Sequence, residues 1–263
     1  MQVTSAQLPA IEDSDDKIFT TPNAVIMLDG ASAFLPVPTA ANLYADHLGR
    51  TMREHLAAEP AAPLRTVLAE AIGTTAAHFD LAAGTSPSSA VTIARIANGE
   101  LELLLLGDNM AILPGEFRTD DRMDHLNLAP RRRYRERLAA GTGYDTTHKE
   151  LLRELQQQQA ALRNVDGGYW IAETNPYAAR QALISTHPLD HVPWLILATD
   201  GAYNTMTHLG LTDWPRYARA DHSQLASLLH HCQQWESHHD PQAQALPRAK
   251  RHDDKSIAAI ATP

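Results

Sequence analysis

The stretch SAVTIARIANGELELLLLGDNMAIL, residues 89–113, carries the strongest structural signal in the chain. The apolar runs on either side of Asn98-Gly99 have the length and composition of buried strands. Asn-Gly between two such runs is typical of a type I′ turn, because both central positions of that turn need a positive φ. Gly107-Asp108 then interrupts the second run, and the last four residues of the stretch continue as a further strand. The stretch therefore predicts an antiparallel hairpin followed by a third strand.

Other apolar runs extend this pattern along the chain. Three of them have the length of buried strands, and each borders an acidic residue or a glycine: 23–28, 194–199 and 256–261. Apolar residues at helical spacing predict four helices, at about 40–58, 64–79, 147–163 and 222–236. Strands interrupted by helix pairs, together with a clear hairpin, favour an α+β fold over a doubly wound parallel sheet. The sequence contains neither GxGxxG nor GxxxxGK[ST], so Rossmann and P-loop nucleotide sites lack their central feature.

Composition limits the class of protein. The 263 residues suit one domain, 1–263, with 31 acids against 22 bases and a net charge of −9. An acidic chain gains nothing from neutralising phosphates, so nucleic acid is not expected as a partner. The single cysteine, Cys232, excludes an internal disulfide. No apolar run approaches the roughly 20 residues of a membrane span, and the N-terminus has no signal-peptide pattern. We expect a soluble cytoplasmic protein without a membrane partner; the sequence leaves its oligomeric state open.

Acidic residues stand where predicted strands begin or end. They occur in four places, with Glu12-Asp13 upstream of the first: Leu28-Asp29-Gly30, Leu106-Gly107-Asp108, Thr199-Asp200-Gly201 and His252-Asp253-Asp254. Carboxylates that gather at one rim of a sheet repel one another, and a bound cation relieves that repulsion. Oxygen ligands suit Mg²⁺ or Mn²⁺, and two such ions can activate a water for phosphoryl transfer. The alternative is that each Asp-Gly is only a turn, since the sequence does not show that these residues meet.

The order of these segments resembles the type 2C (PPM) family of metal-dependent protein phosphatases. The resembling segments are Glu12-Asp13 with NAVIMLDG (23–30), the hairpin segment 86–113, WLILATDGAYN (194–204) and HDDKSIAAIA (252–261). Together they span nearly the whole chain. The resemblance implies a four-layer α-β-β-α sandwich of two antiparallel sheets flanked by helix pairs, with a two-metal site at one end.

The resemblance also implies roles for individual residues. Asp29 would bridge two metals, the carbonyl oxygen of Gly30 would ligate one of them, and Asp200 and Asp253 would complete the first site. These three aspartates would be the catalytic residues. The implied reaction is hydrolysis of a phosphomonoester on protein Ser or Thr by a metal-activated water, with Mg²⁺ or Mn²⁺ as cofactor and a phosphoprotein as substrate.

Further acids would act around this centre. Asp108, with Asp200, matches positions that hold a third, weaker metal. Asp13 and Glu12 would act through water in the outer shell. Asp254 stands where the family commonly has Asn, so we treat it as a neighbour of the metal ligands.

Three departures from the family pattern are visible. No Arg precedes the Glu12-Asp13 pair, where many members have one that binds substrate phosphate. The usual Asp-Gly-His-Gly or Asp-Gly-Met-Gly reads Asp-Gly-Ala-Ser at 29–32, and Asn204 replaces an acid, which weakens the third metal site. One run of bases offers replacement phosphate binders, with a solvated helix face as the alternative: Arg131, Arg132, Arg133, Arg135 and Arg137.

Several functions remain open at this level. A metal-dependent phosphatase is the leading hypothesis. The alternatives are a pseudophosphatase that acts as a regulatory binding protein, and a phosphatase of small molecules on the same site. The segment HHCQQWESHHD, residues 230–240, contains zinc-ligand residue types but no familiar zinc spacing, and a polar surface helix is the preferred interpretation.

Overall fold

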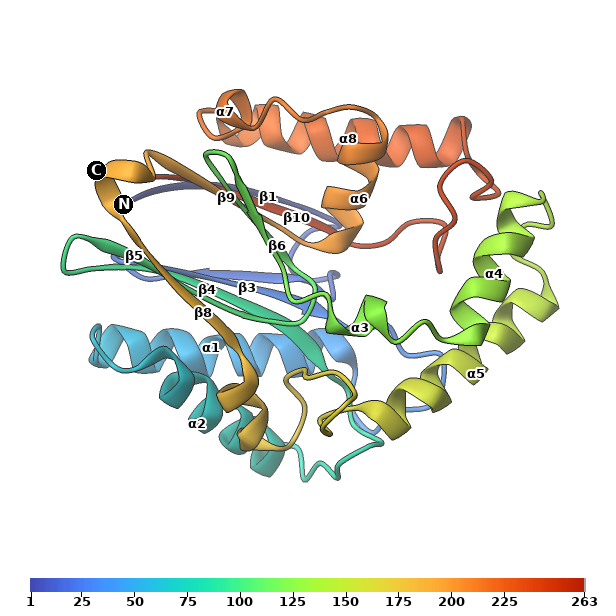
Figure 1. Ribbon diagram of the computed structural model, residues 1–263, viewed down its shortest axis with the longest axis horizontal. Coiled ribbons are helices and arrows are strands. Elements are labelled where there is room, and N and C mark those ends of the chain that lie inside the picture. Colours follow the sequence, from blue (N-terminus) through green and yellow to red (C-terminus); the bar gives the residue numbers. More distant parts are fainter. Residues whose placement is uncertain (263) are drawn as a thin grey trace.

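The chain forms two five-stranded antiparallel sheets stacked face to face, as a computed structural model describing residues 1–262 shows (Figure 1). The first sheet has the order β1-β10-β9-β6-β7: Gln2–Leu8, Lys255–Ala261, Trp194–Ala198, Met110–Leu113 and Glu116–Arg118. The second has the order β2-β3-β4-β5-β8: Lys17–Thr20, Ala24–Gly30, Ser89–Ala97, Glu100–Leu106 and Leu183–Pro188.

Helices cover both outer faces of this sandwich (Figure 1). The second sheet is covered by α1 (Ala41–Ala58) and α2 (Leu64–His78), and the first sheet by α6 (Asp200–His208), α7 (Trp214–Tyr217) and α8 (His222–His238). This arrangement confirms the predicted α+β, four-layer α-β-β-α sandwich.

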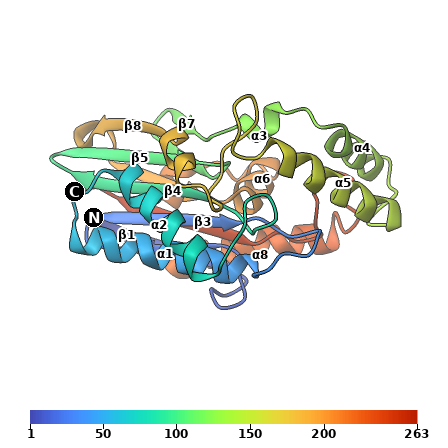
Figure 2. The same ribbon diagram turned by 90° about the horizontal axis from the view of Figure 1, so that it is seen from below.

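A third group of helices lies beyond one end of the sandwich in both views (Figures 1 and 2). It consists of α3 (Arg122–His125), α4 (Ala129–Ala139) and α5 (Thr146–Leu162). Two short 3₁₀ helices, Pro176–Gln181 and Leu189–His191, flank β8.

The predicted hairpin is confirmed as β4 and β5. Its turn residues Asn98 and Gly99 have φ values of 52° and 78°, the positive angles that a type I′ turn requires. The strands at 23–28, 194–199 and 256–261 and the four predicted helices are also present, with ends that shift by one or two residues. No helix within residues 1–262 is long and apolar enough to cross a membrane.

Alternation along the strands builds the core. On β3, Val25 and Met27 point between the two sheets, whereas Ile26 and Leu28 point toward α1 and α2, as the two-residue period of a strand dictates. α1 lies so close to this sheet that a Cβ on Gly49 would be 2.1 Å from the Phe19 ring. The stacking therefore fixes where the strand ends lie.

The chain passes from one sheet to the other at two points that matter for the site. Residues 9–16 connect β1 in the first sheet to β2 in the second, and residues 107–109 connect β5 in the second sheet to β6 in the first. Asp16 and Asp108 stand at these crossings.

Candidate active site

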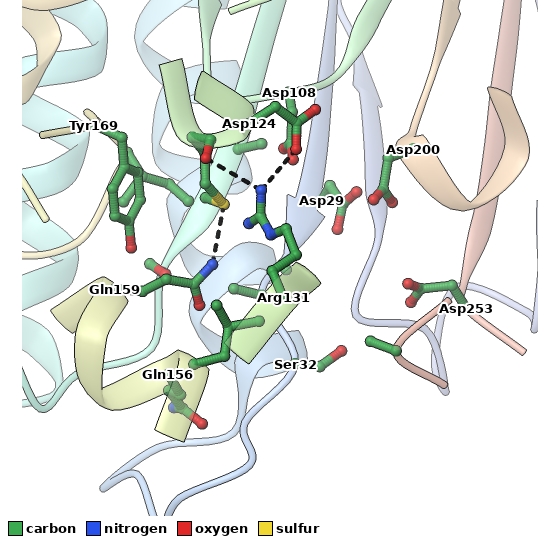
Figure 3. A pocket seen from close by; sticks show the side chains of 18 of the residues that line it. Asp29, Ser32, Asp108, Asp124, Arg131, Gln156, Gln159, Tyr169, Asp200 and Asp253 are labelled. Carbon is green, nitrogen blue, oxygen red and sulfur yellow. Dashed lines mark hydrogen bonds and ion pairs between the residues drawn. The ribbon is translucent and has the colours of Figure 1, made fainter. Parts of the chain in front are cut away.

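A pocket of about 350 Å³ opens at the end of the sandwich that faces α4 and α5. Five of the residues predicted to bind metal line it: Asp29, Gly30, Asp108, Asp200 and Asp253. Figure 3 shows the four carboxylates of this set around the same space. The fold thus brings together acids that are far apart in the sequence: Asp29 and Asp253 are separated by 224 positions.

Each of these acids is positioned by a different element. Asp29 is the last but one residue of β3 and pairs with Ala90 on β4. Asp108 stands at the crossing between the sheets, and Asp253 precedes β10. Asp200 is the first residue of α6, so its carboxylate also lies at the positive end of a helix.

The glycines that follow Asp29 and Asp200 have a packing role. A Cβ on Gly30 would lie 2.6 Å from the carbonyl oxygen of Asp15, and one on Gly201 would lie 2.1 Å from that of Asp254. Any larger residue would push these backbones apart. The glycine of each Asp-Gly pair therefore allows a neighbouring acidic segment to pack close to the site. The Asp200-Gly201 pair also begins a helix, whereas the alternative considered from the sequence was a turn.

None of the N-terminal acids lines the pocket, and the one that lies behind its acids is Asp16, whereas the predicted Asp13 does not approach them. Asp13 is exposed in a turn whose backbone N–H donates to the carbonyl of Ala10, and neither it nor Glu12 lines the pocket. Asp16 is buried, accepts a hydrogen bond of 2.8 Å from Thr199 Oγ1 and interacts electrostatically with Asp29. The sequence signal was present, because four acids occur within residues 12–16, but their spacing alone did not identify the one that turns inward.

Asp254 has a structural role beside the site. Its Oδ2 accepts hydrogen bonds from the backbone N–H of Asp15 and from Ser14 Oγ. It therefore holds the segment that carries Asp16, in keeping with its interpretation as a neighbour of the ligands.

The acids of the pocket strongly perturb one another. Burial, followed by the charges of Asp16 and Asp200, raises the pKa of Asp29 well above its ordinary value. Burial, with the charge of Asp253 next, does the same to the pKa of Asp200, and a side-chain hydrogen bond with Asp29 partly offsets the rise. Burial also raises the pKa of Asp108 to about 6 and that of Asp16 to about 7. Asp29, Asp108 and Asp200 are each partly exposed to solvent, and all three line the pocket.

This all-oxygen donor set suits a hard divalent cation. Asp29, Asp108 and Asp200 line the same pocket, and their mutual repulsion favours a cation, which would lower the cost of their ionisation. Within residues 1–262, however, no three Asp, Glu, His or Cys side chains converge tightly enough to hold an ion as they stand. The acids share a pocket, and an ion would have to draw their oxygens inward.

A lysine already contacts one of the candidate ligands. Lys250 Nζ lies 2.6 Å from Asp253 Oδ1 and lines the pocket. Burial disfavours the charged amine, but attraction to Asp253 outweighs burial and raises the pKa of Lys250. The contact uses Oδ1, so a cation would bind Asp253 through its other carboxylate oxygen, Oδ2, or compete with this ammonium group.

The far wall of the pocket comes from α4 and α5. Gln156 on α5 accepts hydrogen bonds from the backbone N–H groups of Phe34 and Leu35, at 2.6 and 2.8 Å. Tyr144 donates to the carbonyl of Lys250, and His148 Nε2 lies 2.8 Å from the carbonyl of Ala249. These contacts tie the helices to the loops that follow Asp29 and precede Asp253.

The arginine run on α4 divides between two faces. Arg131 and Arg135 line the pocket. The other three lie near carboxylates elsewhere: Arg132 near Glu136, Arg133 near Glu154 and Arg137 with Asp145. The pocket also contains Asn204 of α6, which the resemblance placed at the third metal site, together with Tyr203 of α6 and Ser32, to which sequence reasoning assigned no contact.

The histidine-rich segment 230–240 does not form a zinc site. It lies on α8, where Cys232 is buried in the apolar core under the helix. Glu236 is occupied by Lys255, His252 and the hydroxyl of Thr205. The segment is a helix that packs against the first sheet and supports the loop before β10.

Solved structures of bacterial phosphatases share this architecture. A bacterial serine phosphatase aligns over 100% of this chain and 98% of its own, with a TM-score of 0.63 and 12% identity. The serine/threonine phosphatase Stp1 from Staphylococcus aureus aligns over 100% and 94%, with a TM-score of 0.59 and 11% identity. The catalytic domain of PstP, in complex with two manganese ions, aligns over 98% and 96%, with a TM-score of 0.53 and 12% identity. No family model and no curated protein sequence matches the chain.

Proposed function

Because the chain has the fold of the bacterial PPM-type Ser/Thr phosphatases over its full length, we propose that it is a metal-dependent phosphomonoester hydrolase acting on phosphoserine or phosphothreonine in proteins. The observation that carries the proposal is the convergence of Asp29, Asp108, Asp200 and Asp253 on one pocket. PPM-type folds alone do not specify an activity, so the residues of the site have to support it.

In this proposal the acids of the pocket would hold the metal ions. Asp29, the carbonyl of Gly30, Asp200 and Asp253 would hold two Mg²⁺ or Mn²⁺ ions, and Asp108 with Asp200 would hold a third, weaker one. Bound ions supply a hydroxide nucleophile at neutral pH and neutralise the phosphoryl oxygens. Asp16, through its hydrogen bond to Thr199, would keep the strand end that carries Asp200 in place.

The test is hydrolysis of p-nitrophenyl phosphate with Mn²⁺, with Mg²⁺ and with chelator. We expect activity that chelator abolishes and that Asp29→Asn and Asp200→Asn each lower about a hundredfold or more, since each removes a charged ligand from the metal centre. Asp13→Asn is the matched control, because Asp13 is exposed outside the pocket, and it should keep the wild-type rate. Chelator-resistant activity, or full activity in Asp29→Asn, would refute the mechanism.

The class of substrate needs a separate comparison. A panel of phosphoserine and phosphothreonine peptides should be hydrolysed with higher kcat/KM than phosphorylated metabolites if the substrate is a protein. Turnover of metabolites alone, with inert peptides, would select the small-molecule phosphatase instead.

One observation favours a second function. The ion pair between Lys250 and Asp253 supplies a positive charge that a metal would otherwise supply, and no ready metal-binding group exists among residues 1–262. A pseudophosphatase that binds a partner through this pocket would have this arrangement. Folded protein that shows no turnover and no calorimetric binding of Mn²⁺ would establish that alternative.

A further inference from the structure

The pocket contains both acids and bases. Four of its acids stand at the ends of the sheets, Asp121 and Asp124 lie at α3, and four bases also line it: Arg131, Arg135, Arg163 and Lys250. A phosphate dianion that approaches the acids at the ends of the sheets needs a positive group to face it, so the question is which base is free to do this.

Two of the bases are already committed to other groups. Arg163 is buried and bonds to Glu173 at 2.7 Å, to the Tyr169 hydroxyl and to the carbonyl of Ser86. Lys250 is held by Asp253 at 2.6 Å. Moving Arg163 toward a ligand would leave Glu173, whose side chain is 3% exposed, without its partner in the protein interior, and moving Lys250 would break its short ion pair with Asp253.

Arg131 has open donors. Its Nη1 atom bonds to the carbonyl of Met123 at 3.1 Å and to Asp124 Oδ1 at 2.7 Å, while Nε and Nη2 donate to no acceptor among residues 1–262. The side chain extends into the pocket (Figure 3) and is only 13% exposed.

The ion pair between Arg131 and Asp124 is weak. Asp124 is 62% exposed, and an ion pair with one such solvated member contributes little because water screens it. Exchanging this carboxylate for a phosphate dianion therefore costs little. Arg135 is four residues further along α4, on the same helix face, and has no ion-pair partner within the described residues.

We propose that Arg131, assisted by Arg135, binds phosphate in this pocket. The two arginines would hold the phosphoryl group of the substrate against the acids at the ends of the sheets. This inference rests on the proposed phosphatase function and assigns the anion contact within it. The planar guanidinium of Arg131 offers two parallel N–H groups to two phosphoryl oxygens, which a lysine does not.

The test is the affinity for inorganic phosphate, measured by calorimetry in Mn²⁺ and as product inhibition of p-nitrophenyl phosphate hydrolysis. We expect Arg131→Ala to weaken phosphate binding and to raise KM about tenfold or more, because a charge-assisted bond to a dianion is lost. Arg131→Lys should recover part of the loss, and Arg135→Ala should have a smaller effect. Arg132→Ala is the matched control, because Arg132 is exposed on α4 and does not line the pocket.

The outcomes separate this inference from the function it rests on. Equal phosphate affinity in Arg131→Ala, Arg131→Lys and wild type would overturn the inference even if the enzyme is active, as would a wild-type protein that binds no phosphate. Wild-type protein that binds phosphate through Arg131 but hydrolyses no ester would overturn the proposed function and leave the inference standing.

Discussion

Asp16 shows how a residue that interacts with the candidate site can be missed in the sequence. The resemblance pointed to Glu12-Asp13, but residues 10–13 form a turn that leaves Asp13 in solvent. Asp16 is identified only through Thr199, a partner 183 residues away. The four pocket acids were predictable because each sits at the end of a strand, whereas the inward-facing acid of the N-terminal segment depended on a tertiary contact.

Asp16 should also make the stability of the metal-free protein depend on pH. Its pKa is raised by burial to about 7, so the folded state holds the proton more tightly than the unfolded state. Stability from this group is therefore present below pH about 4 and is lost as pH rises through about 7, by at most about 4 kcal/mol. We expect the urea midpoint in chelator to fall between pH 5 and pH 8, and Asp16→Asn, which cannot ionise, to reduce that fall.

Asp13→Asn serves as the control for this measurement, because an exposed carboxyl should leave the slope unchanged. If Asp16→Asn and wild type lost stability in parallel as the pH increased, the burial of an ionised Asp16 would not be the cause.

Among the helices and strands, those with a regular apolar period could be predicted from the sequence, and those without one were harder to identify. The hairpin β4–β5 was evident because its runs are apolar and joined by Asn98-Gly99. Helix α4 was not, because only Pro130, Tyr134 and Leu138 of its eleven residues are buried and no wide apolar stripe forms. Strand β8 is an edge strand with mostly exposed residues, and it lacks the alternation that marks a strand. Of the two helices that form the far wall of the pocket, α5 was therefore predicted from the sequence and α4 was not.

Replacing a glycine by alanine should have opposite effects on stability in α1, which packs tightly on the second sheet, and in α2, which has room for a Cβ at Gly73. Gly49→Ala would place a Cβ 2.1 Å from Phe19 Cε2, so α1 must move, and we expect a loss of about 1–3 kcal/mol. Gly73→Ala in α2 meets its nearest neighbour, Pro176, at an ordinary 3.5 Å and should gain up to about 1 kcal/mol from helix propensity. Urea denaturation measures both, and a stabilising Gly49→Ala would show that α1 has room at this point.

The bond from α5 to the loop after β3 predicts a looser pocket wall when it is removed. Gln156→Ala leaves the N–H groups of Phe34 and Leu35 without their acceptor, at a local cost of about 1–3 kcal/mol. Hydrogen exchange at these two amides should become faster. Gln157→Ala, an exposed change on the same helix, is the control and should leave that exchange unchanged; equal protection in both variants would mean that the loop is held by other contacts.

For the whole molecule, metal binding should stabilise the fold, since only the folded chain brings Asp29, Asp200 and Asp253 together. A cation at a hundred times its Kd adds about 2.7 kcal/mol. In a chain of this size that corresponds to a rise in Tm of roughly 5–10 °C. Differential scanning calorimetry with added Mn²⁺ measures the shift, which Asp29→Asn should abolish. An equal shift in Asp29→Asn would place the ion elsewhere on the acidic surface.

The crossings between the sheets have a consequence for the inter-sheet core. Asp29 belongs to one sheet, Asp200 and Asp253 adjoin the other, and Asp16 and Asp108 stand where the chain passes between them. Neither sheet alone contains the pocket. A slide of one sheet over the other by a fraction of an ångström would alter the distances from Asp29 to Asp200 and Asp253, although no acid had been changed. Substitutions at Met27 or Leu197, buried between the sheets, belong in any search for variants with altered cation affinity.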